Sequence, residues 1–143
     1  LRARAGGGRV VVAIEPRSNS MRLGAHAAEL ASSLDDADVV FNAAKAGVRI
    51  LDTQALSRAK RLKIAADANA VPPSGIEGVG AKDNGVELKT AGGIARGLGA
   101  LAIGDVKYRV HTGLLAQMYE SDEPIYLAHA EAFALARSIV AQR

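Results

Sequence analysis

The chain has 143 residues, 49% of them hydrophobic, which is enough for one compact domain and too few for two ordinary ones. It has no cysteine, which excludes disulfides, a thiolate nucleophile and cysteine-ligated metal centres, and only 3% aromatic residues, which disfavours base-stacking nucleic-acid platforms. The formal net charge is +3 with both signs interspersed, so we expect an ordinary solvated surface and no nucleic-acid partner.

Segments typical of membrane or secreted proteins are not found in the sequence. No apolar run reaches the roughly 18 residues of a membrane span, and no secretory signal is visible. We therefore expect a cytoplasmic protein without a membrane partner, present as a monomer or a homodimer. Because the first residue is Leu1 rather than Met, we expect a piece of a longer or processed protein.

Strand-like and helix-like stretches alternate through the first half of the chain. Residues 10–14 (VVVAI) are a continuous apolar run, which predicts a strand buried on both faces. Good helix caps follow at 18–20, and apolar residues then recur at helical spacing as far as Leu34. Further along, we predict strands at 39–41 and 62–66, separated by a short helix capped by Asp52 or Thr53.

The second half is predicted to hold a loop, a strand and two helices. Residues 74–97 are rich in glycine and favour a loop with a small hairpin turning at Asn84 and Gly85. Residues 98–103 are expected to form a fourth strand. A helix is predicted at 106–119, and a second one begins near Pro124. Their apolar faces comprise Val106, Val110, Gly113 and Leu114 on the first helix, and Ala128, Ala132, Leu135 and Ile139 on the second.

This alternation predicts a single α/β domain over residues 1–143, of the Rossmann-like two-layer or three-layer kind, with a mostly parallel sheet of about four strands. If the strands lie side by side in chain order, right-handed crossovers place the connecting elements on one face. The other face then needs cover, which we expect from the two C-terminal helices or from a second copy of the chain.

Ligands of open parallel sheets bind beyond the carboxyl ends of the strands, where three segments are expected: 15–22 (EPRSNSMR), 42–47 (NAAKAG) and 67–75 (DANAVPPSG). In the first segment, Arg17, Ser18 and Ser20 stand at a helix start and could hold an anion, although simple capping explains the same residues. In the third, Asp67 and Asn69 either face a ligand or shape the turn before the prolines.

Other signals of chemistry are weak. No G-x-G-x-x-G fingerprint follows the first strand, and the three histidines lack the spacing of metal ligands. No nucleophilic side chain with a matching general base can be recognised in the sequence. We therefore predict no catalytic residue and no metal site.

Several stretches carry a resemblance: ADVVFNAAKAGV (37–48), KIAADANAVPPSGIEGV (63–79), GLGALAIGDVKY (97–108), and the helical end through LLAQMYESDEP (114–124) and EAFALA (131–136). With the specific motif D-x-N-A-x-P-P-x-G-I among them, residues 38–143 resemble the C-terminal part of the NAD(P)-dependent methylene-tetrahydromethanopterin dehydrogenases. Such enzymes pass hydride from the methylene group of a pterin one-carbon carrier to a nicotinamide nucleotide. The resemblance implies NAD or NADP as a cofactor. It also implies a cleft lined by Asn42, Ala43 and Gly47 of one loop and by Asp67 and Asn69 of the other.

The first 37 residues carry a different resemblance. The stretches LRARAGGGRVVVAIEPRSNSMRLG (1–24) and ELASSLDDADVVF (29–41) are similar to the C-terminal domain of the muropeptide ligases, which join a tripeptide to UDP-N-acetylmuramate at the expense of ATP. The two resemblances overlap at ADVVF (37–41). This predicts a chimera, engineered or recombined, with its junction within residues 34–42.

Neither resemblance covers the whole of the enzyme concerned. The pterin-side domain and the glycine loop of the first Rossmann strand have no counterpart, and neither do the ATP-binding and UDP-sugar domains of the ligase. We therefore predict a folded chimera with no catalytic activity of its own. One alternative is a module that binds NAD(P) or another phosphate ligand weakly, with Arg17, Ser18 and Ser20 in place of the lost glycine loop. The other is a dehydrogenase fragment that is active by itself or with a partner chain.

Overall fold

A computed structural model describes the backbone of residues 2–5 and 8–13, and residues 32–142 with their side chains. Contacts divide the chain into two compact units, Leu1–Ala102 and Ile103–Arg143. The expectation that residues 1–143 form one domain stays a prediction.

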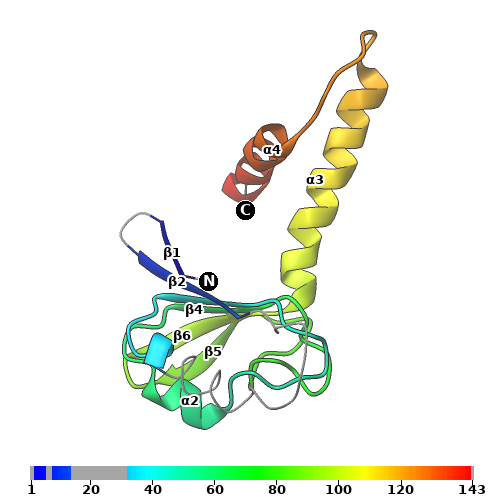
Figure 1. The fold of residues 1–143 in the computed structure, drawn as a ribbon. Helices are drawn as coiled ribbons and strands as arrows, with labels where there is room; N and C mark the ends of the chain where they lie inside the picture. The colour runs from blue at the N-terminus through cyan, green and yellow to red at the C-terminus, as the bar shows by residue number, and fades with distance from the viewer. Residues whose placement is uncertain (1, 6–7, 14–31, 143) are drawn as a thin grey trace, which may run out of the picture. The chain divides into compact units, whose positions relative to one another are not determined.

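A six-stranded sheet with the order β1-β2-β3-β4-β6-β5 organises the first unit (Figure 1). Its strands are β1 (Arg2–Ala5), β2 (Gly8–Ala13), β3 (Val39–Asn42), β4 (Ile64–Asp67), β5 (Asn84–Thr90) and β6 (Gly93–Leu98). The four central strands β2, β3, β4 and β6 pair in parallel, whereas β1 pairs with β2 and β5 with β6 in antiparallel fashion. The predicted α/β class is confirmed. The sheet has six strands rather than about four, and it is mixed because both outer strands run antiparallel to their neighbours. That the fold is Rossmann-like stays a prediction.

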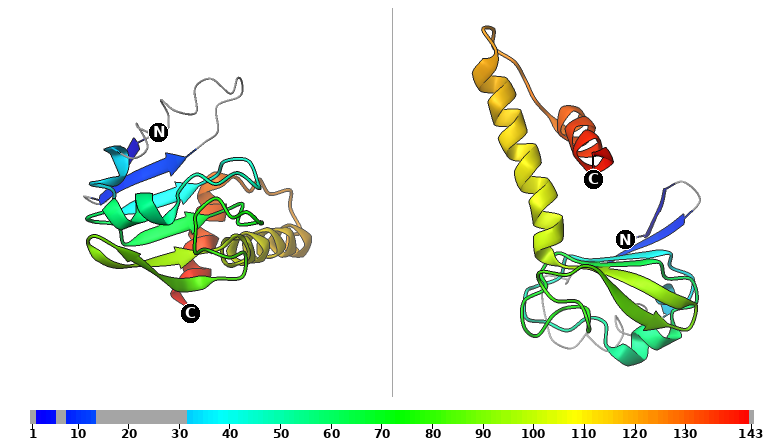
Figure 2. Two further views of the ribbon diagram at one scale, coloured as in Figure 1. Left: turned by 90° about the horizontal axis from the view of Figure 1, so that it is seen from below. Right: turned by 180° about the vertical axis from the view of Figure 1, so that it is seen from behind.

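Two helical segments between the described strands of this unit lie on one face of the sheet (Figures 1 and 2). They are the turn of helix at residues 32–34 and the helix α2 (Thr53–Arg58). As the sequence predicts, α2 is capped by Asp52, whose Oδ1 accepts a hydrogen bond of 2.7 Å from the Ala55 N–H. The one-sided arrangement follows from parallel strands that are added in chain order.

The hydrophobic core lies between the sheet and these segments. Alternate residues of the central strands point into it, among them Val40, Ala65 and Ala95, which are fully buried. On the opposite face, Ile64 and Ile94 are 37% and 60% exposed. A sheet buried on one face fixes the strand register, because a slip by one residue would turn the core side chains outward.

Strand β5 forms one edge of the sheet and alternates in the same way. Leu88 is buried in the core, whereas its neighbours Glu87 and Lys89 are exposed. Glu87 also forms an ion pair of 3.0 Å with Arg96 on β6.

Two local predictions are wrong. Residues 98–103 do not form a strand, because β6 ends at Leu98 and a helix begins at Ala100; a short apolar run does not distinguish strand from helix by periodicity. The hairpin exists, but it turns at Ala91 and Gly92 rather than at Asn84 and Gly85. Asn84 and Gly85 instead lie at an irregularity in the β5–β6 register.

The second unit is built from two helices, α3 (Ala100–Glu120), which begins at the end of the first unit, and α4 (His129–Ala141). Val110 and Ile139 are its buried hydrophobic side chains among the described residues. The helices approach closely at Gly113, where an added Cβ would lie 2.8 Å from Leu135 Cδ2. These residues belong to the predicted apolar faces. That the two helices cover the open face of the sheet stays a prediction.

The start of α4 is stabilised by Glu131, whose Oε2 accepts a hydrogen bond of 2.8 Å from the Ala128 N–H. This backbone hydrogen bond lowers the pKa of the Glu131 carboxyl. None of the helices in the described ranges is both long and apolar enough to cross a membrane.

Candidate functional site

The carboxyl ends of β3 and β4 place two polar side chains next to each other. Asn42 and Asp67 are the last residues of these strands and stand opposite each other in the register. Both are buried, with exposed fractions of 1% and 0%. The Asn42 Nδ2 donates a hydrogen bond of 2.9 Å to Asp67 Oδ1. The strand register thus brings together two residues that are 25 positions apart in the sequence.

The Asp67 carboxylate binds the loop that follows its own strand. Its Oδ1 accepts a hydrogen bond of 3.0 Å from the Asn69 N–H, and its Oδ2 accepts one of 3.0 Å from the Ile76 N–H. Together with Asn42, three donors therefore point at this buried carboxylate. Such hydrogen bonds offset the cost of burying a polar group in the protein core.

Asn42 binds the neighbouring loop in the same way. Its Oδ1 accepts a hydrogen bond of 3.0 Å from the Ala44 N–H, and the Asn69 Nδ2 donates to the Ala44 carbonyl. Asn42, Ala44, Asp67, Asn69 and Ile76 are called the inner cluster below. The inner cluster joins the loop after β3 to the loop after β4.

Gly75 fits against the inner cluster because it has no side chain. A Cβ at this position would lie 2.0 Å from Asn42 Nδ2, a distance that real Cβ atoms do not show. The Gly75 carbonyl also accepts hydrogen bonds from the N–H groups of Ile50, at 2.8 Å, and Leu51, at 2.9 Å. The glycine of the D-x-N-A-x-P-P-x-G-I motif is therefore required by packing.

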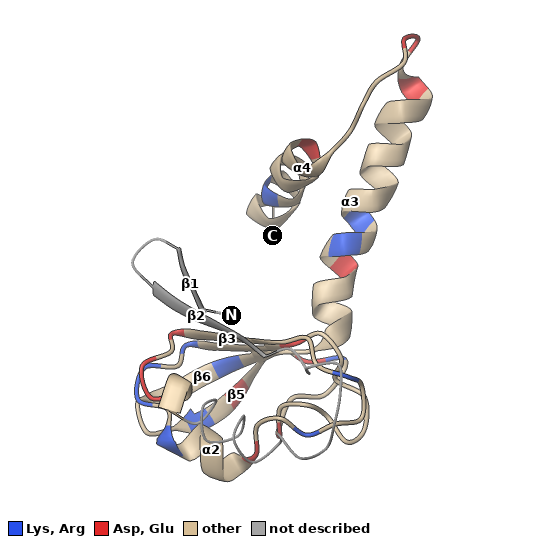
Figure 3. Ribbon diagram, in the orientation of Figure 1, with Lys and Arg blue, Asp and Glu red and all other residues tan. Residues whose placement is uncertain are grey.

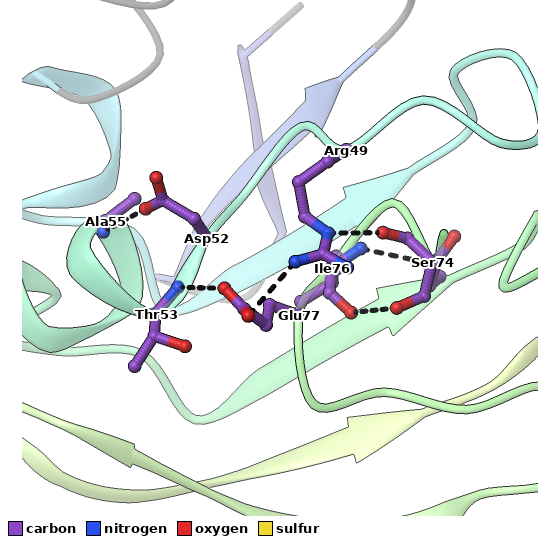
Figure 4. Close-up of polar contacts among 8 residues, drawn as sticks. Arg49, Asp52, Thr53, Ala55, Ser74, Ile76 and Glu77 are labelled. Carbon is purple, nitrogen blue, oxygen red and sulfur yellow. Dashed lines mark hydrogen bonds and ion pairs between the residues drawn. The ribbon is translucent and has the colours of Figure 1, made fainter. Parts of the chain in front are cut away.

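A second set of contacts joins the same two loops nearer the surface (Figure 4). The Arg49 guanidinium forms an ion pair of 3.1 Å with Glu77 and donates from Nε to the Ser74 carbonyl at 2.9 Å. Glu77 Oε2 accepts a hydrogen bond of 2.8 Å from the Thr53 N–H at the start of α2. The Thr53 hydrogen bond, with Arg49 beside it, lowers the pKa of the Glu77 carboxyl. Arg49, Thr53, Ser74 and Glu77 are called the outer cluster.

The structure brings together three of the site residues predicted from the sequence, Asn42, Asp67 and Asn69, within the inner cluster. Ala43 is exposed and Gly47 half-buried on the adjoining loop, where the φ of Gly47 is +79°. The remaining three, Arg17, Ser18 and Ser20, lie outside the described residues. That Asn42, Ala43, Gly47, Asp67 and Asn69 contact a cofactor stays a prediction.

Sequence reasoning missed Gly75 and the outer cluster. Gly75 belongs to the D-x-N-A-x-P-P-x-G-I motif, so its importance could have been predicted from its spacing from Asp67. The contact between Arg49 and Glu77 could not have been predicted, because it depends on how two loops meet.

Lys45 is exposed on the loop after β3, whereas the charge of Arg49 on the same loop is paired with Glu77. Figure 3 shows how basic and acidic residues are distributed over the chain. An exposed cation suits an anionic ligand. Within the described ranges, no three His, Asp or Glu side chains are grouped so that they could hold a metal ion.

No family model matches the chain. The chain is 42% identical over 108 residues to the NAD(P)-dependent methylenetetrahydromethanopterin dehydrogenase of Methylorubrum extorquens, a match that covers 76% of the chain and 36% of that protein. It is also 36% identical over 112 residues to the bifunctional protein MdtA of the same organism, covering 78% of the chain and 37% of that protein. The chain thus spans little more than one third of the length of these curated relatives.

The similarity includes both loops of the candidate site. A continuous stretch of 108 residues in a chain of 143 contains residues 36–108 wherever it begins. The inner and outer clusters lie inside that range. The resemblance of this part of the chain to the dehydrogenase is confirmed, whereas the resemblance of the first 37 residues to the ligases stays a prediction.

Proposed function

We propose that this chain is the nucleotide-binding part of a methylene-tetrahydromethanopterin dehydrogenase, and that it holds NAD or NADP at the carboxyl edge of a Rossmann-like sheet. The observation that carries this proposal is the 42% identity to an NAD(P)-dependent dehydrogenase over 108 residues, a stretch that includes the two loops that follow β3 and β4. Loops at this edge are the usual ligand site of parallel sheets.

The residues of the loop after β3 fit a dinucleotide. Ala43, Ala46 and Gly47 have small side chains, which let a ligand approach the backbone closely. Lys45 is exposed between them and supplies a positive charge for a phosphate group. The bound nucleotide would supply the hydride acceptor, while this loop would hold its charged part in place.

We further propose that hydride transfer needs a second polypeptide segment that holds the pterin substrate. The chain covers 36% of the dehydrogenase it matches, and catalysis requires both reactants to be positioned together. Residues 1–37 would then replace the start of the nucleotide-binding domain by a ligase-like unit, joined within residues 34–42. The overlap of the two resemblances at residues 37–41 supports this chimera.

Titration of the protein with NADPH and NADH by isothermal calorimetry tests the binding step. We expect saturable binding that weakens in the Lys45→Met variant, with Lys82→Met as a control that removes an exposed lysine of the loop before β5. No binding of either nucleotide up to about 5 mM, a free energy of only about 3 kcal/mol, would overturn the proposal.

The requirement for a second segment is tested by mixing the protein with methylene-tetrahydromethanopterin and NADP and following NADPH absorbance. The chain alone should give no NADPH. Turnover by the purified chain alone would show instead that it contains a complete active site.

A further inference from the structure

Resting on the proposed function, we infer that Asp67 is a positioning residue, which does not contact the nucleotide but holds both loops of the site in one arrangement. Asp67 would then have a structural role in the site, which differs from the ligand contact that its place at the end of a strand first suggests.

The hydrogen bonds of the carboxylate carry this inference. Asp67 has an exposed fraction of 0%, and its two oxygens accept from Asn42 Nδ2, the Asn69 N–H and the Ile76 N–H at 2.9–3.0 Å. Those donors come from β3 and from two positions of the loop after β4. Three donors take up most of the acceptor sites of the carboxylate, and because the residue has no exposed surface, a ligand atom could reach it only if neighbouring groups moved.

Asn42 transmits the effect to the other loop. Its amide nitrogen is held by Asp67, which orients its oxygen toward the Ala44 N–H at 3.0 Å. If the carboxylate is lost, the Asn42 amide loses the partner that fixes its orientation. The Ala44 N–H should then become less protected, although it makes no contact with Asp67.

Gly75 offers an independent way to disturb the same arrangement. An added Cβ would lie 2.0 Å from Asn42 Nδ2 and 3.2 Å from Asp67 Oδ2. The Gly75→Ala variant keeps the carboxylate but displaces the side chain that the carboxylate holds. If Asp67 acts through Asn42, this variant should behave like Asp67→Asn.

Amide hydrogen exchange of the free protein tests the positioning role. Asp67→Asn keeps the size of the side chain but turns one acceptor into a donor. We expect exchange at Ala44, Asn69 and Ile76 to accelerate by about tenfold or more in Asp67→Asn and Gly75→Ala, as local opening becomes easier. Leu62→Ala is the control, because Leu62 is a buried core residue that precedes β4, at the other end of that strand. It should lower the melting temperature without selectively accelerating these three amides.

Exchange at Ala44 that stays at the wild-type rate in Asp67→Asn would overturn the inference, whether or not a nucleotide binds. Equal acceleration of the three amides in Leu62→Ala would also overturn it, because the effect would then be general destabilisation.

Nucleotide titration of the same variants separates positioning from ligand contact. At temperatures where every variant is folded, NADPH affinity should fall about tenfold or more in both Asp67→Asn and Gly75→Ala and stay near wild type in Leu62→Ala. Loss of affinity in Asp67→Asn without faster exchange at Ala44 would show that Asp67 contacts the nucleotide directly, which contradicts the inference. Failure of the wild-type protein to bind nucleotide would overturn the proposed function, and the exchange result would still decide the role of Asp67.

Discussion

Asn42 and Asp67 end two neighbouring parallel strands, stand opposite each other in the register and share a hydrogen bond of 2.9 Å in the interior of the protein. This hydrogen bond connects the two strands, whereas the other hydrogen bonds of the two side chains connect them to the loops after β3 and β4. The strand register therefore determines where those loops lie.

Removing the amide of this pair should destabilise the fold. Asn42→Leu keeps the approximate size of the side chain but leaves the Asp67 carboxylate and the Ala44 N–H each without one partner. We expect the free energy of unfolding to fall by about 2–4 kcal/mol, measured by urea denaturation, because two buried polar groups each lose a hydrogen bond. Asn69→Ala, at a half-buried position, serves as the control and should cost about 1 kcal/mol. A larger loss in Asn69→Ala than in Asn42→Leu would contradict this account.

Glu77 should make stability depend on pH in the acid range. Its pKa is lowered from the ordinary value of 4.5, chiefly by the Thr53 N–H and then by Arg49. A carboxyl group with a lowered folded-state pKa contributes stability above its unfolded pKa, and the contribution is lost as the pH falls through the folded value. The difference in melting temperature between wild type and Glu77→Gln should therefore be full near neutral pH and vanish in acid.

Arg49→Met provides the control for this pH dependence. It removes the ion pair but keeps the backbone hydrogen bond that is the main cause of the lowered pKa. The melting temperature of Arg49→Met should still fall in acid by most of the amount that Glu77 causes in the wild type. In Glu77→Gln this part of the fall should be absent. A variant Arg49→Met that matches Glu77→Gln at every pH would show that the ion pair is the dominant cause.

Two glycines of α3 should respond in opposite ways to the same substitution. Gly104 has open space where a Cβ would lie, so Gly104→Ala should stabilise the helix by up to about 1 kcal/mol. At Gly113 the added Cβ would lie 2.8 Å from Leu135 Cδ2 and would displace that side chain. Gly113→Ala should therefore lower the stability, because this displacement costs more than the gain in helix propensity. Thermal melting followed by circular dichroism checks the order of the two variants. A Gly113→Ala protein at least as stable as Gly104→Ala would contradict the close approach of α3 and α4.

Gly97 of β6 should be coupled to Val86 of β5. A Cβ at Gly97 would lie 2.6 Å from Val86 Cγ1, so Gly97→Ala should cost about 1–3 kcal/mol through overpacking. Shortening the neighbour in the double variant Gly97→Ala/Val86→Ala should recover part of this loss. A double-mutant cycle from urea denaturation should show coupling of about 1 kcal/mol, whereas additive losses would indicate that the two residues do not meet.

The sequence predicted the strands β3 and β4 better than the segment from β5 to the start of α3. The strands at β3 and β4 and the cap at Asp52 follow from continuous apolar runs and local hydrogen bonding, which are visible in a few adjacent residues. The start of α3 was missed because glycine and small apolar residues between Leu98 and Ile103 fit either structure. The turn of the β5–β6 hairpin was misplaced because strand pairing, rather than the local Asn84–Gly85 signal, determines where the chain reverses.

The sequence predicted that Asp67 and Asn69 follow a strand; in the structure Asp67 is the last residue of β4 and Asn69 lies just beyond it. That these residues form a ligand site stays a prediction. Their partners could not be predicted, because the contact between Asn42 and Asp67 depends on a register between segments 25 residues apart. The meeting of Arg49 with Glu77 depends in turn on that register.

The exposed charges of β5 bear on how copies of this chain behave when concentrated. An unpaired edge strand can recruit strands from other molecules and so begin fibril growth. A strand from another molecule that paired with β5 would lie beside Glu87 and Lys89 and would displace part of the water around these charged side chains. Alternating charged and apolar positions therefore allow the sheet to end at β5 while discouraging its extension into a polymer.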